Sequence, residues 1–298
     1  MILLTFSTRD DTPRLGVQRD DTVIDVSALA RSTGAEAPAD LATLINQGSA
    51  GLAALTTLVG GDEAQQFSLP ISEVSVHAPL RPGKIIGVGL NYTEHVAESA
   101  RTLDTDKELP QRPVLFSKPA TAVVGPGEPI RHNANLTHQL DWECEVAVVI
   151  GRTAKNVSAA DALDYVFGYS IINDISARDQ RRGGQWFFSK GQDSYAPFGP
   201  VVRTADDLTN PHDLDLSLRV NGEVKQKSNS RYMLFKIPEL IEDITSGMTL
   251  EPGDVIATGS PAGVGASFVP QQFLSPGDIV ECTVESIGTL SNPVIDAR

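Results

Sequence analysis

Cysteine is scarce in this chain of 298 residues, which contains only Cys144 and Cys282. The two lie far apart in sequence, and their spacing matches no cysteine-based metal motif. They give no disulfide framework of the kind that stabilises small secreted proteins. This usage fits a reducing compartment, so we expect a cytoplasmic location.

Long apolar runs are also missing. No run approaches the ~20 residues that a membrane-spanning helix needs. The apolar start, Met1 to Phe6, reaches Arg9, Asp10 and Asp11 at once, with no basic leader and no small-residue cleavage site. We therefore expect neither a membrane span nor a targeting segment.

Positive charge is the third shortage. The chain has 24 Lys and Arg against 38 Asp and Glu, a formal net charge of -14. Nucleic-acid binding draws most of its affinity from Lys and Arg on phosphate, so this balance argues against nucleic acid as a partner. A small anionic substrate would need a local cation to overcome the field.

The residues that are abundant describe a compact, turn-rich globular protein. Hydrophobic residues make up 41%, with 25 Gly and 19 Pro. We predict a small N-terminal α/β domain over residues 1–75, with strands at Ile2–Ser7 and Thr22–Val26. Two helices should follow, one from the N-cap Asp40 to Gly48 and one ending at Gly60. The main domain, residues 80–298, is rich in strands and has few, short helices. This pattern predicts an α+β fold with a rolled, mixed β-sheet.

One acidic strand stands out. Asp141-Trp142-Glu143-Cys144-Glu145 runs into Val146 to Ile150 before Gly151. Strand alternation places Glu143 and Glu145 on one face, beside Ala147 and Val149. Two half-buried carboxylates repel each other and need a cation or a shared proton, and a metal ion would provide the cation. The alternative is that both point to solvent from an edge strand.

A histidine and a carboxylate lie three residues apart on a short predicted helix capped by Asn91. His95 and Glu98 would share one face of that helix. A carboxylate beside an imidazole fixes its tautomer and raises its basicity, which makes a general base. The alternative is a surface ion pair. His132 and His138, in a polar loop, are expected at the surface.

Five motifs together resemble the fumarylacetoacetate hydrolase family, over residues from about Pro82 to Pro293. In family order they are Gly-Leu-Asn-Tyr-x-x-His-x-x-Glu at 89–98, Asp-Trp-Glu-x-Glu at 141–145, Asn-Asp-Ile-Ser-Ala-Arg-Asp at 173–179, Lys190 with an Ala-Pro-x-Gly-Pro turn, and Ala-Thr-Gly-Ser-Pro-Ala-Gly-Val-Gly at 257–265. The N-terminal residues resemble the small first domain of many bacterial members. A homodimer is also what the resemblance implies.

The resemblance implies a role for each motif residue. Glu143, Glu145 and Asp174 would bind one divalent metal. Three carboxylates without Cys or His form a hard oxygen site that suits Mg²⁺ or Mn²⁺. His95 and Glu98 would form a catalytic dyad, with Lys190 as a further catalytic residue and proton donor. The predicted substrate contacts are Tyr92, Arg178, Gln180 and Thr258.

One departure from the family concerns a substrate contact. Many relatives have Gln three residues after the motif arginine, whereas here Arg181 occupies that position and Gln180 precedes it. The chain also has no counterpart to the additional aspartate ligand of the namesake enzyme, so fumarylacetoacetate is a poor candidate substrate.

From these residues we predict a metal-dependent hydrolase that cuts the bond between carbons 3 and 4 of a 2,4-diketo acid. Such an acylpyruvate would yield pyruvate and a carboxylic acid. The alternatives are decarboxylation of an oxaloacetate-type 2-keto diacid and isomerisation or hydration of a 2-keto-enoate. These share the same metal chelate, so family likeness does not separate them.

Overall fold

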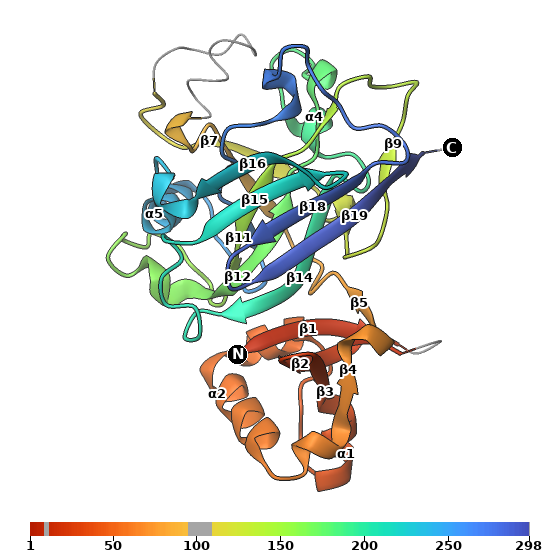
Figure 1. Cartoon of the computed structure of the whole chain (residues 1–298). Coiled ribbons are helices and arrows are strands. Elements are labelled where there is room, and N and C mark those ends of the chain that lie inside the picture. The colour runs from red at the N-terminus through yellow and green to blue at the C-terminus, as the bar shows by residue number, and fades with distance from the viewer. Residues whose placement is uncertain (9–11, 95–108, 298) are drawn as a thin grey trace.

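Two packed β-sheets with few helices make up the protein (Figure 1), in a computed structural model that describes residues 1–8, 12–94 and 109–297. Among the described residues, the larger of these sheets has 12 strands and the smaller has five, both contain parallel and antiparallel pairs, and a separate two-stranded ladder joins β10 (Leu140–Asp141) to β13 (Ser176–Ala177). Apolar residues of both sheets, such as Val146 and Leu218, belong to one buried cluster. The predicted α+β fold with a mixed sheet is confirmed.

The N-terminal unit is a small antiparallel sheet covered by two helices. Its elements are β1 (Ile2–Ser7), β2 (Arg14–Arg19), β3 (Thr22–Asp25), α1 (Val26–Thr33), α2 (Leu41–Gly60), β4 (Ser68–Pro70) and β5 (Ser75–His77). Asp40 caps α2 by accepting the backbone N–H of Thr43 at 2.7 Å, as predicted. The predicted stop at Gly48 is a kink inside α2, where φ is 60°. The sequence reading missed β2.

The strands of the N-terminal unit belong to the 12-stranded sheet. Strand β1 pairs antiparallel with β14 (Ala196–Thr204), with Leu3 opposite Val202. The order across the sheet is β4-β3-β2-β1-β14-β12-β11-β17-β6-β7. The N-terminal strands therefore extend the sheet that carries the acidic strand, and Figure 1 shows β1 directly below β14. The division at residues 75–80 stays a prediction.

The central strands of the large sheet position the acidic residues. They are β6 (Ile85–Gly89), β7 (Val114–Lys118), β11 (Cys144–Ile150), β12 (Val166–Asn173) and β17 (Val255–Ala257). Strands β12 and β17 flank β11 in the sheet, and all seven residues of β11 are buried because its alternate apolar side chains pack in two core clusters, one on each face. The alternative of an edge strand is therefore wrong. The strand also begins at Cys144 rather than at Asp141.

The five-stranded sheet lies across β11 and β12 (Figure 1). Its order is β16 (Glu223–Asn229), β15 (Asp215–Val220), β18 (Ile279–Val284), β19 (Gly288–Asp296) and β9 (Ile130–His132). Helix α5 (Ile237–Gly247) has Pro238 in its first turn, where no intrahelical hydrogen bond needs the missing N–H. Among the described residues, no helix has the length and apolar character to cross a membrane.

His132 is buried, and its Nε2 lies 3.0 Å from the Thr137 carbonyl oxygen, within hydrogen-bonding distance. The expected surface position of His132 is therefore wrong.

Candidate metal centre

Three buried carboxylates converge where β11 begins and β12 ends. Glu143, Glu145 and Asp174 each place a carboxylate oxygen within 4.8 Å of the others. The register explains the meeting: Cys144 lies opposite Asn173, so the residue before one strand faces the residue after the other. The Asp174 N–H donates to the Glu143 carbonyl at 2.8 Å. The three predicted metal ligands are thus brought together.

Glu145 is held by the turn that follows β17. The Gly259 N–H donates to Glu145 Oε2 at 2.8 Å. Gly259 has φ +99°, and a Cβ there would lie 2.6 Å from the Cβ of Asn91, so only glycine fits. Burial, followed by the charges of Asp174 and Glu143, raises the pKa of Glu145 well above its ordinary value. The site thus holds more negative charge than it can easily stabilise.

Two lysines from different elements meet on one carboxylate. Lys190, in α4 (Phe187–Lys190), donates to Glu143 Oε2 at 2.7 Å and to Asp174 Oδ2 at 2.5 Å. Lys118, at the end of β7, donates to Asp174 Oδ1 and to the Ile175 carbonyl. Its side chain has no exposed surface, and burial lowers its pKa although Asp174 acts in the opposite direction.

Sequence reasoning missed Lys118. A lone lysine at a strand end carries no spacing signal. Only the pairing of β6 with β7 and of β6 with β17 brings Lys118 to the acidic strand.

Arg178 was predicted to contact substrate, and the structure places it among the carboxylates. Its Nε donates to Asp141 Oδ2 at 2.8 Å, and its Nη2 lies 2.6 Å from Glu143 Oε1. Burial opposes its charge, but Asp141 and Glu143 outweigh it and raise the pKa of Arg178. Asp141 also accepts the backbone N–H groups of Gly265 and Ala266, at 2.6 and 3.0 Å. Arg178 therefore orients Glu143 from a fixed anchor, and the sequence reading gave Asp141 no such role.

The charges of this cluster fit a divalent cation. Within the described part of the chain, four buried carboxylates (Asp141, Glu143, Glu145 and Asp174) face three buried cations (Lys118, Arg178 and Lys190). One negative charge is left over, so a bound divalent ion would make the cluster positive and attractive to an anion. Oxygen ligands alone suit Mg²⁺ or Mn²⁺.

The remaining predicted residues lie at different positions. Tyr92 is buried, its hydroxyl has no hydrogen-bond partner among the described residues, and burial followed by the Glu145 charge raises its pKa. Thr258 precedes Gly259 and donates its hydroxyl to the Val146 carbonyl at 2.9 Å. Gln180 donates to the Leu136 carbonyl at 2.6 Å, in a loop 44 residues earlier in the chain, and accepts from Arg182 at 3.2 Å, so both ends of its amide are engaged by the protein itself. His95 and Glu98 lie outside the described residues.

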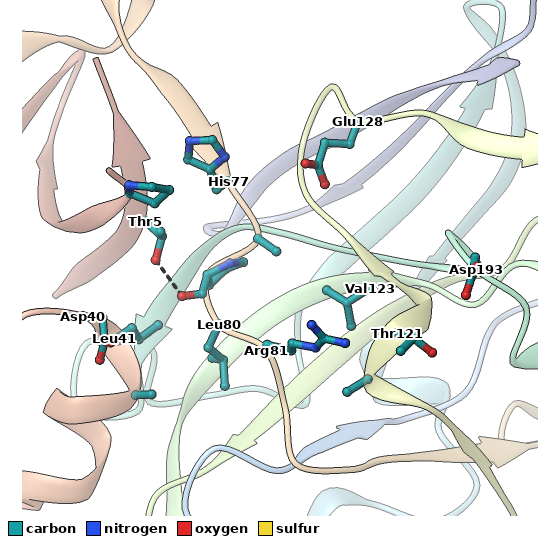
Figure 2. A pocket seen from close by; sticks show the side chains of 15 residues that line it. Thr5, Asp40, Leu41, His77, Leu80, Arg81, Thr121, Val123, Glu128 and Asp193 are labelled. Carbon is teal, nitrogen blue, oxygen red and sulfur yellow. Dashed lines mark hydrogen bonds between the residues drawn. The ribbon is translucent and has the colours of Figure 1, made fainter. Parts of the chain in front are cut away.

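A separate cavity of about 750 Å³ lies between the N-terminal unit and the rest of the chain. Figure 2 shows Arg81, Thr121 and Val123 on its wall, with Thr5 bonded to the neighbouring Pro79 carbonyl. Glu143, Glu145 and Asp174 are not among the residues that line this cavity. It is therefore distinct from the candidate metal centre.

Comparison with known proteins identifies a family and several similar enzymes. The family model described as Fumarylacetoacetate (FAA) hydrolase C-terminal matches residues 84–295. Oxaloacetate tautomerase YisK of Bacillus subtilis is 44% identical over 236 residues, 78% of this chain and 77% of that protein. The solved fumarylacetoacetate hydrolase of Exiguobacterium antarcticum has a TM-score of 0.82 and 34% identity, covering 99% of this chain and 100% of its own. Maleylpyruvate hydrolase of Sphingobium sp. SYK-6, solved with manganese (II) and pyruvate, has a TM-score of 0.80 and 30% identity over 100% of both chains.

Proposed function

This chain belongs to the fumarylacetoacetate hydrolase family, and we propose that it is a metal-dependent enzyme that interconverts the keto and enol forms of oxaloacetate. The sequence motifs had favoured acylpyruvate hydrolysis. The name of the 44% identical Bacillus relative supports oxaloacetate tautomerisation instead. Both reactions pass through the enolate of a small 2-keto acid. Tautomerisation forms it by loss of a carbon-3 proton, whereas hydrolysis releases it when the carbon-carbon bond breaks.

The observation that carries this proposal is the meeting of Lys118 and Lys190 on Asp174, beside Glu143. Enolisation moves a proton from carbon 3 and places negative charge on the oxygen at carbon 2. Buried ammonium groups aimed at that region would stabilise this charge in a site that excludes water. Mg²⁺ or Mn²⁺ held by Glu143, Glu145 and Asp174 would add Lewis-acid polarisation of the keto group.

The other predicted residues have roles consistent with this chemistry. The free hydroxyl of Tyr92 near Glu145 would donate a hydrogen bond to the substrate carboxylate. Arg178 holds Glu143 in position for metal binding. We retain His95, oriented by Glu98, as the group that removes and returns the proton at carbon 3. The homodimer and the cytoplasmic location stay predictions.

The test is decay of freshly dissolved enol oxaloacetate, followed by ultraviolet absorbance, with metal removed by chelator and then restored as Mg²⁺ or Mn²⁺. We expect the enol to decay faster only when metal is present. NMR should show the keto form of oxaloacetate as the product, with no formation of pyruvate. Pyruvate with carbon dioxide would identify a decarboxylase instead. No metal-dependent acceleration would rule the tautomerase out.

Hydrolysis of an acylpyruvate is the second candidate. It is favoured by the likeness to maleylpyruvate hydrolase, which was solved with manganese and pyruvate. Incubation of acetylpyruvate with the metal-loaded protein would then release pyruvate and acetate. Loss of the diketo absorbance without acetate would exclude this reaction.

A further inference from the structure

Arg181 is a cation with no acidic partner among residues 1–8, 12–94 and 109–297. Its guanidinium carbon lies 4.8 Å from the centre of the Trp186 ring. No hydrogen bond or ion pair joins its side chain to any residue in the described part of the chain. It lies at the end of the short turn Arg178–Gln180 and is only partly exposed. A half-buried guanidinium of this kind has five donors available to an anion.

An aromatic pair connects Arg181 to the carboxylate cluster. The Trp186 ring lies 5.5 Å from that of Phe116, and it covers Gly89, where an added Cβ would come within 2.3 Å of the ring. The other end of the pair carries Lys190, whose Nζ lies 4.9 Å from the centre of the Phe116 ring. Lys190 itself binds Glu143 and Asp174. One wall of two aromatic rings thus has a cation at each end.

The charge environment agrees with this placement. Burial, followed by the charge of Arg178, lowers the pKa of Arg181, while Glu143 acts in the opposite direction. The guanidinium stays charged, because an arginine pKa is far above neutral pH. Arg181 is therefore close enough to Arg178 and Glu143 to be affected by their charges, although none of the four carboxylates of the cluster forms an ion pair or hydrogen bond with it.

We propose that Arg181 binds the second carboxylate of a dicarboxylic 2-keto substrate and so selects diacids over monoacids. This role rests on the proposed function, in which the 2-keto acid end lies at Glu143, Glu145 and Asp174. A guanidinium forms paired, charge-assisted hydrogen bonds with a carboxylate. A monoacid of equal length would leave Arg181 as it is in the free protein and would gain nothing from it.

The experiment compares oxaloacetate with 2-oxobutyrate, which has four carbons but one carboxylate. Enolisation of 2-oxobutyrate is followed as exchange of its carbon-3 protons in D₂O by NMR. In Arg181→Gln we expect KM for oxaloacetate to rise about 10- to 100-fold, the usual value of a charge-assisted hydrogen bond. The kcat for oxaloacetate and both constants for 2-oxobutyrate should change less than about threefold. Arg181→Lys should recover part of the affinity for oxaloacetate.

Arg152→Gln is the matched control. Arg152 also stacks on an aromatic ring, with its guanidinium carbon 4.6 Å from the centre of Tyr165, but it is exposed and takes no part in the cluster. This variant should leave both substrates unaffected. An equal effect of Arg181→Gln on both substrates, or no effect on either, would overturn the assignment.

A binding measurement separates this proposal from the proposed function. Malate and 2-hydroxybutyrate differ only in the second carboxylate and do not enolise, so calorimetry with Mg²⁺ measures recognition alone. The wild-type protein should bind malate more tightly, and Arg181→Gln should lose that preference. If the wild type enolises neither keto acid but keeps the malate preference, tautomerisation fails and the role of Arg181 stands. Equal affinity of the wild type for both hydroxy acids refutes that role.

Discussion

Lys118 binds Asp174 from a side chain with no exposed surface, although 56 residues separate the two in sequence. The Asp174 carboxylate then uses its other oxygen for Lys190, at 2.5 Å. Each charge in this group depends on the others, because none has water to stabilise it. Removing one cation should therefore destabilise the charges that remain in the site.

Lys118→Met tests that dependence. Breaking a buried ion pair leaves an uncompensated charge, so we expect the metal-free protein to lose about 3–5 kcal/mol of unfolding free energy. Saturating Mn²⁺ should restore part of the loss, since it supplies positive charge to the same carboxylates. Urea unfolding with and without Mn²⁺ measures both effects. Lys155→Met, at an exposed lysine, is the control and should change stability by less than about 0.5 kcal/mol. A metal-free Lys118→Met protein as stable as the wild type would contradict the prediction.

Glu145→Gln should act in the opposite direction on the metal-free protein. Burial and the neighbouring acids disfavour the charged form of Glu145, so a neutral amide should leave the metal-free protein equally stable or more stable. The same change removes a metal ligand. Mn²⁺ at 100 times the wild-type Kd stabilises the wild type by about 2.7 kcal/mol, and this gain should vanish in the variant. Thermal unfolding with and without Mn²⁺ is the measurement, and a variant that keeps the full gain would show that Glu145 is no ligand.

His95→Ala tests the proposed proton transfer. General base catalysis is worth roughly 100- to 10,000-fold, so turnover should fall by about that factor. Mn²⁺ binding by calorimetry should be unchanged, because His95 is not among the proposed ligands. Full activity in this variant would remove the dyad from the mechanism.

His212 should make stability depend on pH. Its Nε2 accepts the N–H of Ile237 at 3.1 Å, at the start of α5, which requires a neutral ring. Burial, followed by the charge of Lys236, lowers its pKa, while Glu239 acts in the opposite direction. A lowered pKa means that the unfolded chain binds the proton more tightly, so this stabilisation is present above about pH 6.5 and is lost as pH falls.

The measurement for His212 is urea unfolding at pH 7.5 and 5.5 for the wild type and for His212→Gln. Glutamine keeps a hydrogen-bond acceptor but does not titrate. The wild type should lose about 1 kcal/mol more than the variant on acidification, the value of one hydrogen bond. Identical pH dependence of the two proteins would exclude this role for His212.

Much of the candidate site could be predicted from local sequence. Strand alternation paired Glu143 with Glu145, and the order of motifs added Asp174, all of which the structure brings together. The partners of Arg178 could not be predicted from local sequence. Its motif marked it as important, but its bonds to Asp141 and Glu143 depend on how the loop after β13 (Ser176–Ala177) folds back on β10 (Leu140–Asp141).

The sequence by itself determined the fold class from its pattern of strands and short helices, and it indicated the family and the three carboxylates through the resemblance of five short motifs. Only the tertiary structure decided that the acidic strand lies in the middle of the sheet, that Lys118 pairs with Asp174, and that Arg181 has no acidic partner among the described residues. The physical reason is that charge balance in a buried site is a sum over distant segments. Strand order sets which segments contribute, and no local pattern encodes that order.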